Sequence, residues 1–467
     1  MADEAVTLRG INWRETFPFT HLFRAFRVAV HPSKLILALT ALGCLWCGGL
    51  ILDAIWLESY EVTTEQTYQL SGDYPSYAAG AEHLVHVPGV FHTFFDYEVQ
   101  QANDVLMFRG GPWGMCDSTW RFVAWGPLWL WSHHWFFALL YTAWFLLIWS
   151  LFGGAISRIA AVHVARDEKI SVRHAVSFSA NKVLSFIFAP IIPVFIIFVI
   201  GAIMGAVATV LLHIPYVGPF ILGLSFFLAL LGGCIITLVL LGTLGGFNLM
   251  YPTVAVEGSD SFDAISRSFS YVFARPWRML WYTFVAIVYG AICYLFVRFF
   301  VWLVLAATWF FVSWFLGGTH VNQPAEVWPH IWPRPVDPLA PLAYTPQYDL
   351  LKGTEAAAAG LVVWWTYLVI GLIGAFAISF YFSANTIIYF LMRREVDATE
   401  LDDVYVEETE EDLEPGAVAP AGTAVAVETT TVRVYESSEP ASGGATDPAP
   451  ATEPTPPPTS PPPAGGV

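Results

Sequence analysis

Long apolar runs separated by polar stretches set the pattern of the first 394 residues. Each run holds about 20 or more residues with at most one charged side chain, which is enough for a helix to cross a hydrocarbon core of about 30 Å. The pattern predicts an all-α polytopic membrane domain over residues 35–394, with six transmembrane helices. The six runs are residues 35–56, 135–156, 183–212, 219–250, 279–316 and 360–391.

The Lys and Arg residues between these runs predict their orientation, because basic connections stay on the cytoplasmic side. Residues 1–34 and the connection 157–182 each carry five Lys or Arg residues, whereas the long loops 57–132 and 317–359 carry two each. We therefore expect a multi-pass protein of the inner, cytoplasmic membrane. Both termini would lie in the cytoplasm, and the two long loops would lie outside.

Three basic and aromatic segments on the predicted cytoplasmic side share a layout: residues 19–34, 170–183 and 262–278. In the last, apolar side chains recur at helical spacing, with Ser261 placed to cap the helix and Pro276 to end it. We expect each segment to lie along the membrane surface before a pair of spans. Either this is a threefold repeat, or surface helices beside spans have converged on similar residues. The best-matched positions are Arg24, Phe26, Pro32 and Lys34 against Arg267, Phe269, Pro276 and Arg278.

Residues 264–269 (Ala-Ile-Ser-Arg-Ser-Phe), leading into residues 275–278 (Arg-Pro-Trp-Arg), carry a resemblance to a known family. Over about residues 160–395 the chain resembles the polytopic membrane-anchor domain found beside some bacterial glycerophosphoryl diester phosphodiesterases, and other bacterial membrane proteins of that type. The resemblance implies a bacterial membrane domain. The sequence offers no soluble domain for the phosphodiesterase site, so we do not expect that activity.

Composition separates the membrane domain from the C-terminal part of the chain. Hydrophobic residues make up 56% of the chain and charged residues 13%, which excludes an ordinary soluble enzyme. The net charge of −17 is concentrated from residue 395 onward, where there are 16 acidic residues and one basic residue. Residues 395–467 are also rich in Pro, Ala and Thr, and we expect a disordered cytoplasmic tail. It is either a solvating appendage or a carrier of a docking motif formed by Leu401, Asp402, Asp403, Val404 and Tyr405.

Few residues within the spans carry chemistry. Arg298 either extends to the outer interface or is a buried charge on a solute path that needs a carboxylate or carbonyl partner. Pro190 and Pro193 predict a kink in the third span. Two pairs of glycines at i and i+4 predict close helix packing, within the chain or with a partner. The pairs are Gly201 with Gly205, and Gly242 with Gly246.

The first outer loop offers one helix and little chemistry. Apolar side chains recur at helical spacing over residues 91–106, which predicts an amphipathic helix with Val99 on its apolar face. The histidines of the loop only weakly suggest a metal site; they are His83, His86 and His92, with Asp96 nearby. We predict no bound metal and no cofactor.

The sequence shows no phosphate-binding glycine loop, no nucleophile elbow and no zinc-protease helix. It also lacks a basic patch of the size that nucleic-acid binding needs. We therefore expect no catalytic residue and no nucleic-acid partner.

Two functions remain open. The first is a non-enzymatic membrane scaffold or accessory protein that contacts a cytoplasmic protein through the acidic tail. The alternative is a channel or carrier for a small solute, using the third span, the glycine-rich fourth span and Arg298. The lipid bilayer is the one partner that both functions share.

Overall fold

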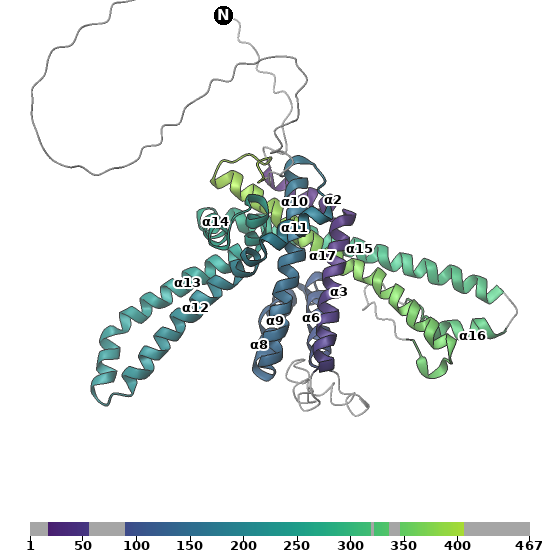
Figure 1. The fold of residues 1–467 in the computed structure, drawn as a ribbon, viewed down its shortest axis with the longest axis horizontal. Helices are drawn as coiled ribbons and strands as arrows, with labels where there is room; N and C mark the ends of the chain where they lie inside the picture. Colours follow the sequence, from purple (N-terminus) through teal and green to yellow (C-terminus); the bar gives the residue numbers. More distant parts are fainter. Residues whose placement is uncertain (1–16, 56–88, 319–321, 336–345, 406–467) are drawn as a thin grey trace, which may run out of the picture. The chain divides into compact units, whose positions relative to one another are not determined.

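The computed structural model describes residues 17–55, 89–318, 322–335 and 346–405, and within these ranges the chain is helical, with no strand (Figure 1). Residues 1–16, residues 56–88 with His83 and His86, residues 319–321 and 336–345, and the acidic tail from residue 406 lie outside the described residues. All of the described residues belong to one unit, residues 1–406.

Within the described ranges, six helical stretches are long and apolar enough to cross a membrane, which confirms the predicted fold class. Each contains or overlaps one of the predicted runs and extends several residues beyond most of them. The second is continued through a π-helical turn, so that α9, η4 and α10 form one stretch. The stretches are α3 (Pro32–Ile55), α9 (Trp135–Ile148) with η4 (Trp149–Gly153) and α10 (Gly154–Arg166), α12 (Val183–Leu212), α13 (Val217–Glu257), α15 (Pro276–Gly318) and α17 (Thr354–Val396).

The three amphipathic segments are helical, and each precedes a pair of these stretches. The second is α11 (Val172–Asn181) and the third is α14 (Ser261–Ala274). The first is split into a 3-10 helix, η1 (Pro18–Arg24), and a short helix, α2 (Ala25–Ala29). The order of the helices therefore matches the predicted layout, in which an amphipathic segment precedes each pair of long helices. The first segment differs from the other two because it is split into a 3-10 helix and a short α-helix.

The ends of α14 follow from the residues beside them, with one correction. The N-cap is Asp260 and not Ser261, because the Asp260 carboxylate accepts a hydrogen bond of 2.9 Å from the backbone N–H of Asp263. The helix ends at Ala274, since Pro276 disfavours a helical conformation at Arg275, which has φ −138° and ψ 60°. Pro276 then begins α15, where its missing N–H is tolerated.

Short helices connect the first two membrane stretches: α6 (Val90–Leu106), α7 (Gly111–Trp120), the π-helical η3 (Arg121–Trp125) and α8 (Gly126–His133). The Asp53 carboxylate of α3 accepts hydrogen bonds from the first N–H groups of α6, at 2.8 Å from Phe91 and 3.2 Å from His92.

The helix expected over residues 91–106 is confirmed, but its buried face differs. Val99 was expected on that face and is 50% exposed, whereas Tyr97 and Gln101 are buried.

The main hydrophobic core lies where α10, α13, α14, α15 and α17 meet near η1 and α2. Gly153 and Gly154 allow α10 to approach Phe382 of α17 and Phe186 of α12 closely. By contrast, α12 and α13 form a hairpin (Figure 1), and few or none of the residues in their most apolar windows are buried in the isolated chain. Apolar surface of this kind suits contact with lipid chains.

Candidate functional site

A buried arginine lies at the centre of the polar end of this core. Arg158 of α10 is 2% exposed, and its guanidinium donates hydrogen bonds to the backbone carbonyls of Ala255 at 2.8 Å and Tyr405 at 2.7 Å. The same guanidinium lies over the ring of Phe178, 4.5 Å from its centroid. Arg158 therefore joins α10, α11, the end of α13 and the segment that follows α17.

The segment after α17 packs back onto the membrane domain. Val404 is 4% exposed and belongs to the main core, and Leu401 packs against the same core. The backbone N–H of Tyr405 donates to the carbonyl of Val256 at 2.8 Å. Gly258 makes room for the Tyr405 ring, because it has a positive φ of 62° and a Cβ atom there would lie 2.7 Å from that ring. Residues 401–405, which we call the tail root, are thus held by side chains and by backbone hydrogen bonds.

Ion pairs around Glu257 hold the tail root further. The Glu257 carboxylate lies 2.7 Å from Arg267 of α14 and 3.2 Å from Arg393 of α17, and it accepts a hydrogen bond of 2.5 Å from Tyr389. Arg393 also pairs with the Asp403 carboxylate at 2.6 Å and donates to the Asp403 carbonyl at 2.7 Å. Arg393 and Glu257 are almost covered, so their ion pair is screened by solvent less than a surface pair would be, whereas Asp403 is 61% exposed.

A second set of contacts fixes the C-terminal end of α17. Tyr271 of α14 donates to Asp397, and Tyr282 of α15 donates to Glu395. Arg278 pairs with the same Glu395 at 2.5 Å. Burial, together with the neighbouring Asp397 carboxylate, raises the pKa of Tyr271 above its ordinary value, so the phenol keeps its proton and remains a donor.

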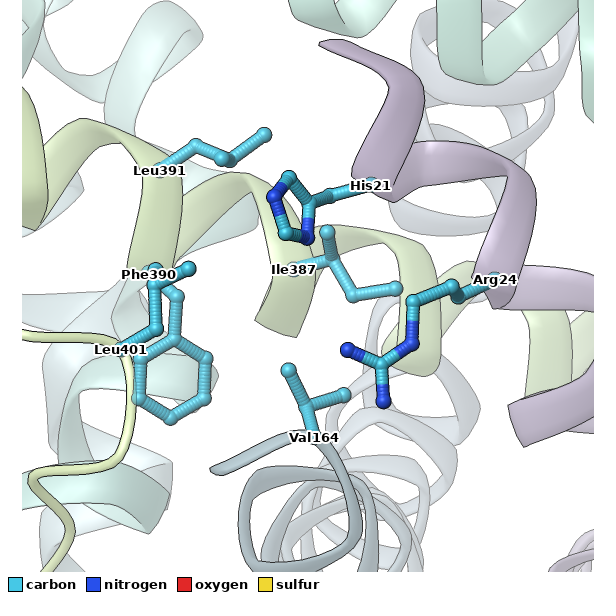
Figure 2. Close-up of a pocket in the computed structure, with 7 residues that line it drawn as sticks. All are labelled: His21, Arg24, Val164, Ile387, Phe390, Leu391 and Leu401. Carbon is cyan, nitrogen blue, oxygen red and sulfur yellow. The ribbon is translucent and has the colours of Figure 1, made fainter. Parts of the chain in front are cut away.

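Leu401 of the tail root also lines a crevice with residues from η1, α10 and α17. Its volume is about 30 Å³, which is close to the space that one water molecule needs. Figure 2 shows His21 and Arg24 of η1 extending toward the side chains of the other helices. The lining residues are His21, Arg24, Val164, Ile387, Phe390, Leu391 and Leu401.

The tail root coincides with the segment that the sequence marked as a docking motif. The structure places Leu401, Asp403, Val404 and Tyr405 against the protein's own α10, α13 and α17, while Asp402 is exposed. Sequence reasoning missed this contact, because the Arg158 and Tyr405 partners are 247 residues apart. The available signals were a charged residue within the extended apolar α10 and the apolar positions Leu401 and Val404 in an acidic stretch.

Arg298 is buried, with 5% exposure, and does not extend to solvent. It donates to the side-chain carbonyl of Asn103 of α6 at 2.8 Å and lies 3.5 Å from the hydroxyl of Tyr294. The neutral amide of Asn103 thus supplies the carbonyl partner that a buried Arg298 was expected to need. Pro190 and Pro193 lie within α12, which is continuous through both of them.

The two glycine pairs have different surroundings. Cβ atoms at Gly242 and Gly246 would meet the ring of Phe269 of α14, at 2.8 Å and 3.4 Å. At Gly201 and Gly205 a Cβ atom would meet nothing within 4 Å. The fourth-span pair therefore packs against the amphipathic helix, while the third-span pair faces open space in the isolated chain.

A buried carboxyl group lies on α6. The Glu98 side chain covers Gly126 of α8, where a Cβ atom would clash with its carboxyl oxygen. Burial raises the pKa of Glu98 to about 8.

On the same helix, His92 pairs with Asp96 at 2.9 Å. Among the described residues no group of three or more His, Cys, Asp or Glu side chains could hold a metal ion.

These observations define the class of protein: a helical polytopic chain with six helices suited to crossing a membrane, and a polar network at one end of its core. No family model, curated protein or solved structure matches the chain.

Proposed function

We propose that this protein is a non-enzymatic scaffold or accessory subunit of the cytoplasmic membrane, and that its acidic tail contacts a cytoplasmic protein. The observation that carries the proposal is the docked tail root. Arg158, Arg393 and Val256 hold residues 403–405 by backbone and ionic contacts, so the tail begins at a defined position on the membrane domain.

Anchoring of this kind favours recruitment. A segment that starts at a fixed point keeps a bound partner at high local concentration beside the membrane domain. Because the tail root is occupied by contacts within the chain, the partner binds the residues that follow Tyr405. Their strong negative charge favours a partner with a basic surface.

The alternative, a channel or carrier with Arg298 on the solute path, gains less support. Arg298 is held by Asn103 and Tyr294, an arrangement that suits a role in packing α6 against α15. Arg298 lines neither the crevice at Leu401 nor a second hollow, which is lined by Phe23, Arg24, Arg27 and Asp167.

Affinity purification from membranes, followed by mass spectrometry, tests the proposal. Three chains are compared: the full chain, a chain ending at Tyr405, and a full-length chain in which Glu and Asp residues between 407 and 414 are changed to Gln and Asn. We expect one or more partners with the full chain, none with the shortened chain, and weaker recovery with the neutralised tail. Equal recovery with all three chains would contradict the proposal.

A further inference from the structure

A lysine without a counter-charge is buried at the start of the first membrane helix. Lys34 is 0% exposed, and its ammonium nitrogen has no hydrogen-bond acceptor in the part of the chain that the structure describes. It lies in the first turn of α3, where the helix dipole favours a negative charge and opposes a positive one. A buried ammonium in such a place is strongly unfavourable unless an anion accompanies it or the amine gives up its proton.

Two histidines lie close to Lys34, and neither supplies a negative charge. The rings of His31 and His163 lie 5.8 Å apart, and both are within electrostatic reach of Lys34. The Nδ1 atom of His31 also has no hydrogen-bond partner among the described residues. Burial, together with Lys34 and Lys169, lowers the pKa of His31, so this imidazole favours its neutral form.

A hollow close to His163 is lined by Phe23, Arg24, Arg27 and Asp167 and has a volume of about 370 Å³. Asp167 lies 3.3 Å from Arg24 and 3.5 Å from Arg27. The Asp167 carboxylate also lies 4.0 Å from the His163 ring, and His163 in turn is within electrostatic reach of Lys34. His163 therefore links the hollow with Lys34. Two guanidinium groups thus face one carboxylate, which is 65% exposed, and the hollow keeps an excess of positive charge.

We propose that this hollow binds a phosphate group, with Arg24 and Arg27 as its direct contacts and the buried amino group of Lys34 nearby. Guanidinium groups are suited to phosphate because they offer paired donors in a planar fork. The volume is ample for a phosphate group with part of the molecule that carries it. Both a phospholipid headgroup and a soluble phosphate have this chemistry, and basic pockets between membrane helices are known to accept lipid headgroups. Arg24 also lines the crevice at Leu401, but the site does not rest on the scaffold proposal.

Thermal unfolding of the purified full chain distinguishes the two sources. One arm compares phosphatidylcholine nanodiscs with nanodiscs that also contain phosphatidylglycerol, and the other adds inorganic phosphate to protein in a neutral detergent. A saturable rise in unfolding temperature with phosphatidylglycerol alone identifies a lipid headgroup, and a rise with inorganic phosphate identifies a soluble ligand. If neither probe raises the unfolding temperature, the proposal is wrong.

Variants locate the effect. Arg24→Gln should weaken binding of the effective probe about fivefold, the effect expected of one basic side chain. Lys34→Met keeps the volume of the buried side chain and should also weaken the stabilisation by the probe, while raising the unfolding temperature without ligand because a buried polar group without a hydrogen-bond partner is gone. The control is Arg173→Gln, an exposed basic residue of α11, which should bind as the original protein does. Undiminished stabilisation of both Arg24→Gln and Lys34→Met would overturn the proposal.

Discussion

The guanidinium of Arg158 donates a hydrogen bond of 2.7 Å to the backbone carbonyl of Tyr405, so a residue within a membrane helix holds the start of the acidic tail. The acceptor is a backbone group, so the contact depends on the path of the chain more than on the identity of the tail side chains. The contact joins the tail root to the unit whose hydrophobic core also contains Leu22 of η1.

Replacing Arg158 should release the tail root. Arg158→Gln removes charge-assisted hydrogen bonds to two carbonyls, and we expect a loss of about 2 kcal/mol in stability. Limited proteolysis in detergent should then cut residues 397–405 faster, and thermal unfolding should occur at a lower temperature. The control is Arg166→Gln, an exposed residue of the same helix. Equal cleavage rates in both variants would show that the contact does not hold the segment.

The two glycine pairs should respond differently to added bulk. A side chain at Gly242 meets the ring of Phe269, so Gly242→Leu should overpack this contact and cost about 1–3 kcal/mol. Gly201→Leu adds the same side chain where nothing lies within 4 Å, and we expect it to leave the stability of the purified chain unchanged. Thermal unfolding of both variants in detergent provides the measurement. A larger loss for Gly201→Leu would mean that the third span packs against a partner at that position.

Glu98 should make stability depend on pH. Its pKa in the folded protein, about 8, lies above the ordinary value of 4.5, so the folded state binds the proton more tightly than the unfolded state. This contribution is fully present below pH 4.5 and is lost as the pH rises toward 8, by at most about 1.4 kcal/mol per pH unit.

Glu98→Gln keeps a neutral side chain at every pH. It should reduce the decline in unfolding temperature between pH 5 and pH 8, and at pH 8 it should be more stable than the original protein. Glu168→Gln, at an exposed position, serves as the control and should leave the decline unchanged. An identical pH dependence for Glu98→Gln and the original protein would contradict the assignment.

Arg298 should act in packing rather than in transport. Arg298→Gln removes its hydrogen bond to Asn103 and shortens a buried side chain, with an expected cost of about 1–3 kcal/mol. In proteoliposomes, solute flux should be the same for the variant and the original protein. A flux present only in the original protein would favour the channel or carrier.

Much of the fold could be predicted because its signals are local. The apolar runs identify the six long helices, and the spacing from Phe91 to Leu106 identifies α6. Contacts between distant segments could not be predicted in the same way. The cap that Asp53 provides for α6 and the burial of Tyr97 and Gln101 on α6 depend on how α3 and α9 pack around it.

The candidate site shows the same limit. The sequence marked residues 401–405 as able to dock, since Leu401 and Val404 are apolar within an acidic stretch. It could not indicate that the docking surface belongs to the same chain, because Arg158 and Val256 are far away in sequence. The basic residues Arg24 and Lys34 were noted as parts of a repeat, and the burial of Lys34 emerges only when α3, α10 and α17 are packed together.

The central claim is that the tail beyond the tail root contacts a cytoplasmic protein. Photo-crosslinking in intact cells tests it most directly, with a photoreactive amino acid placed either at Leu413 in the tail or at Trp113, an exposed residue of α7 in the predicted outer loop. The account predicts a discrete crosslinked product containing a cytoplasmic protein from position 413 and no such product from position 113. No adduct at position 413, or the same adducts from both positions, would contradict it.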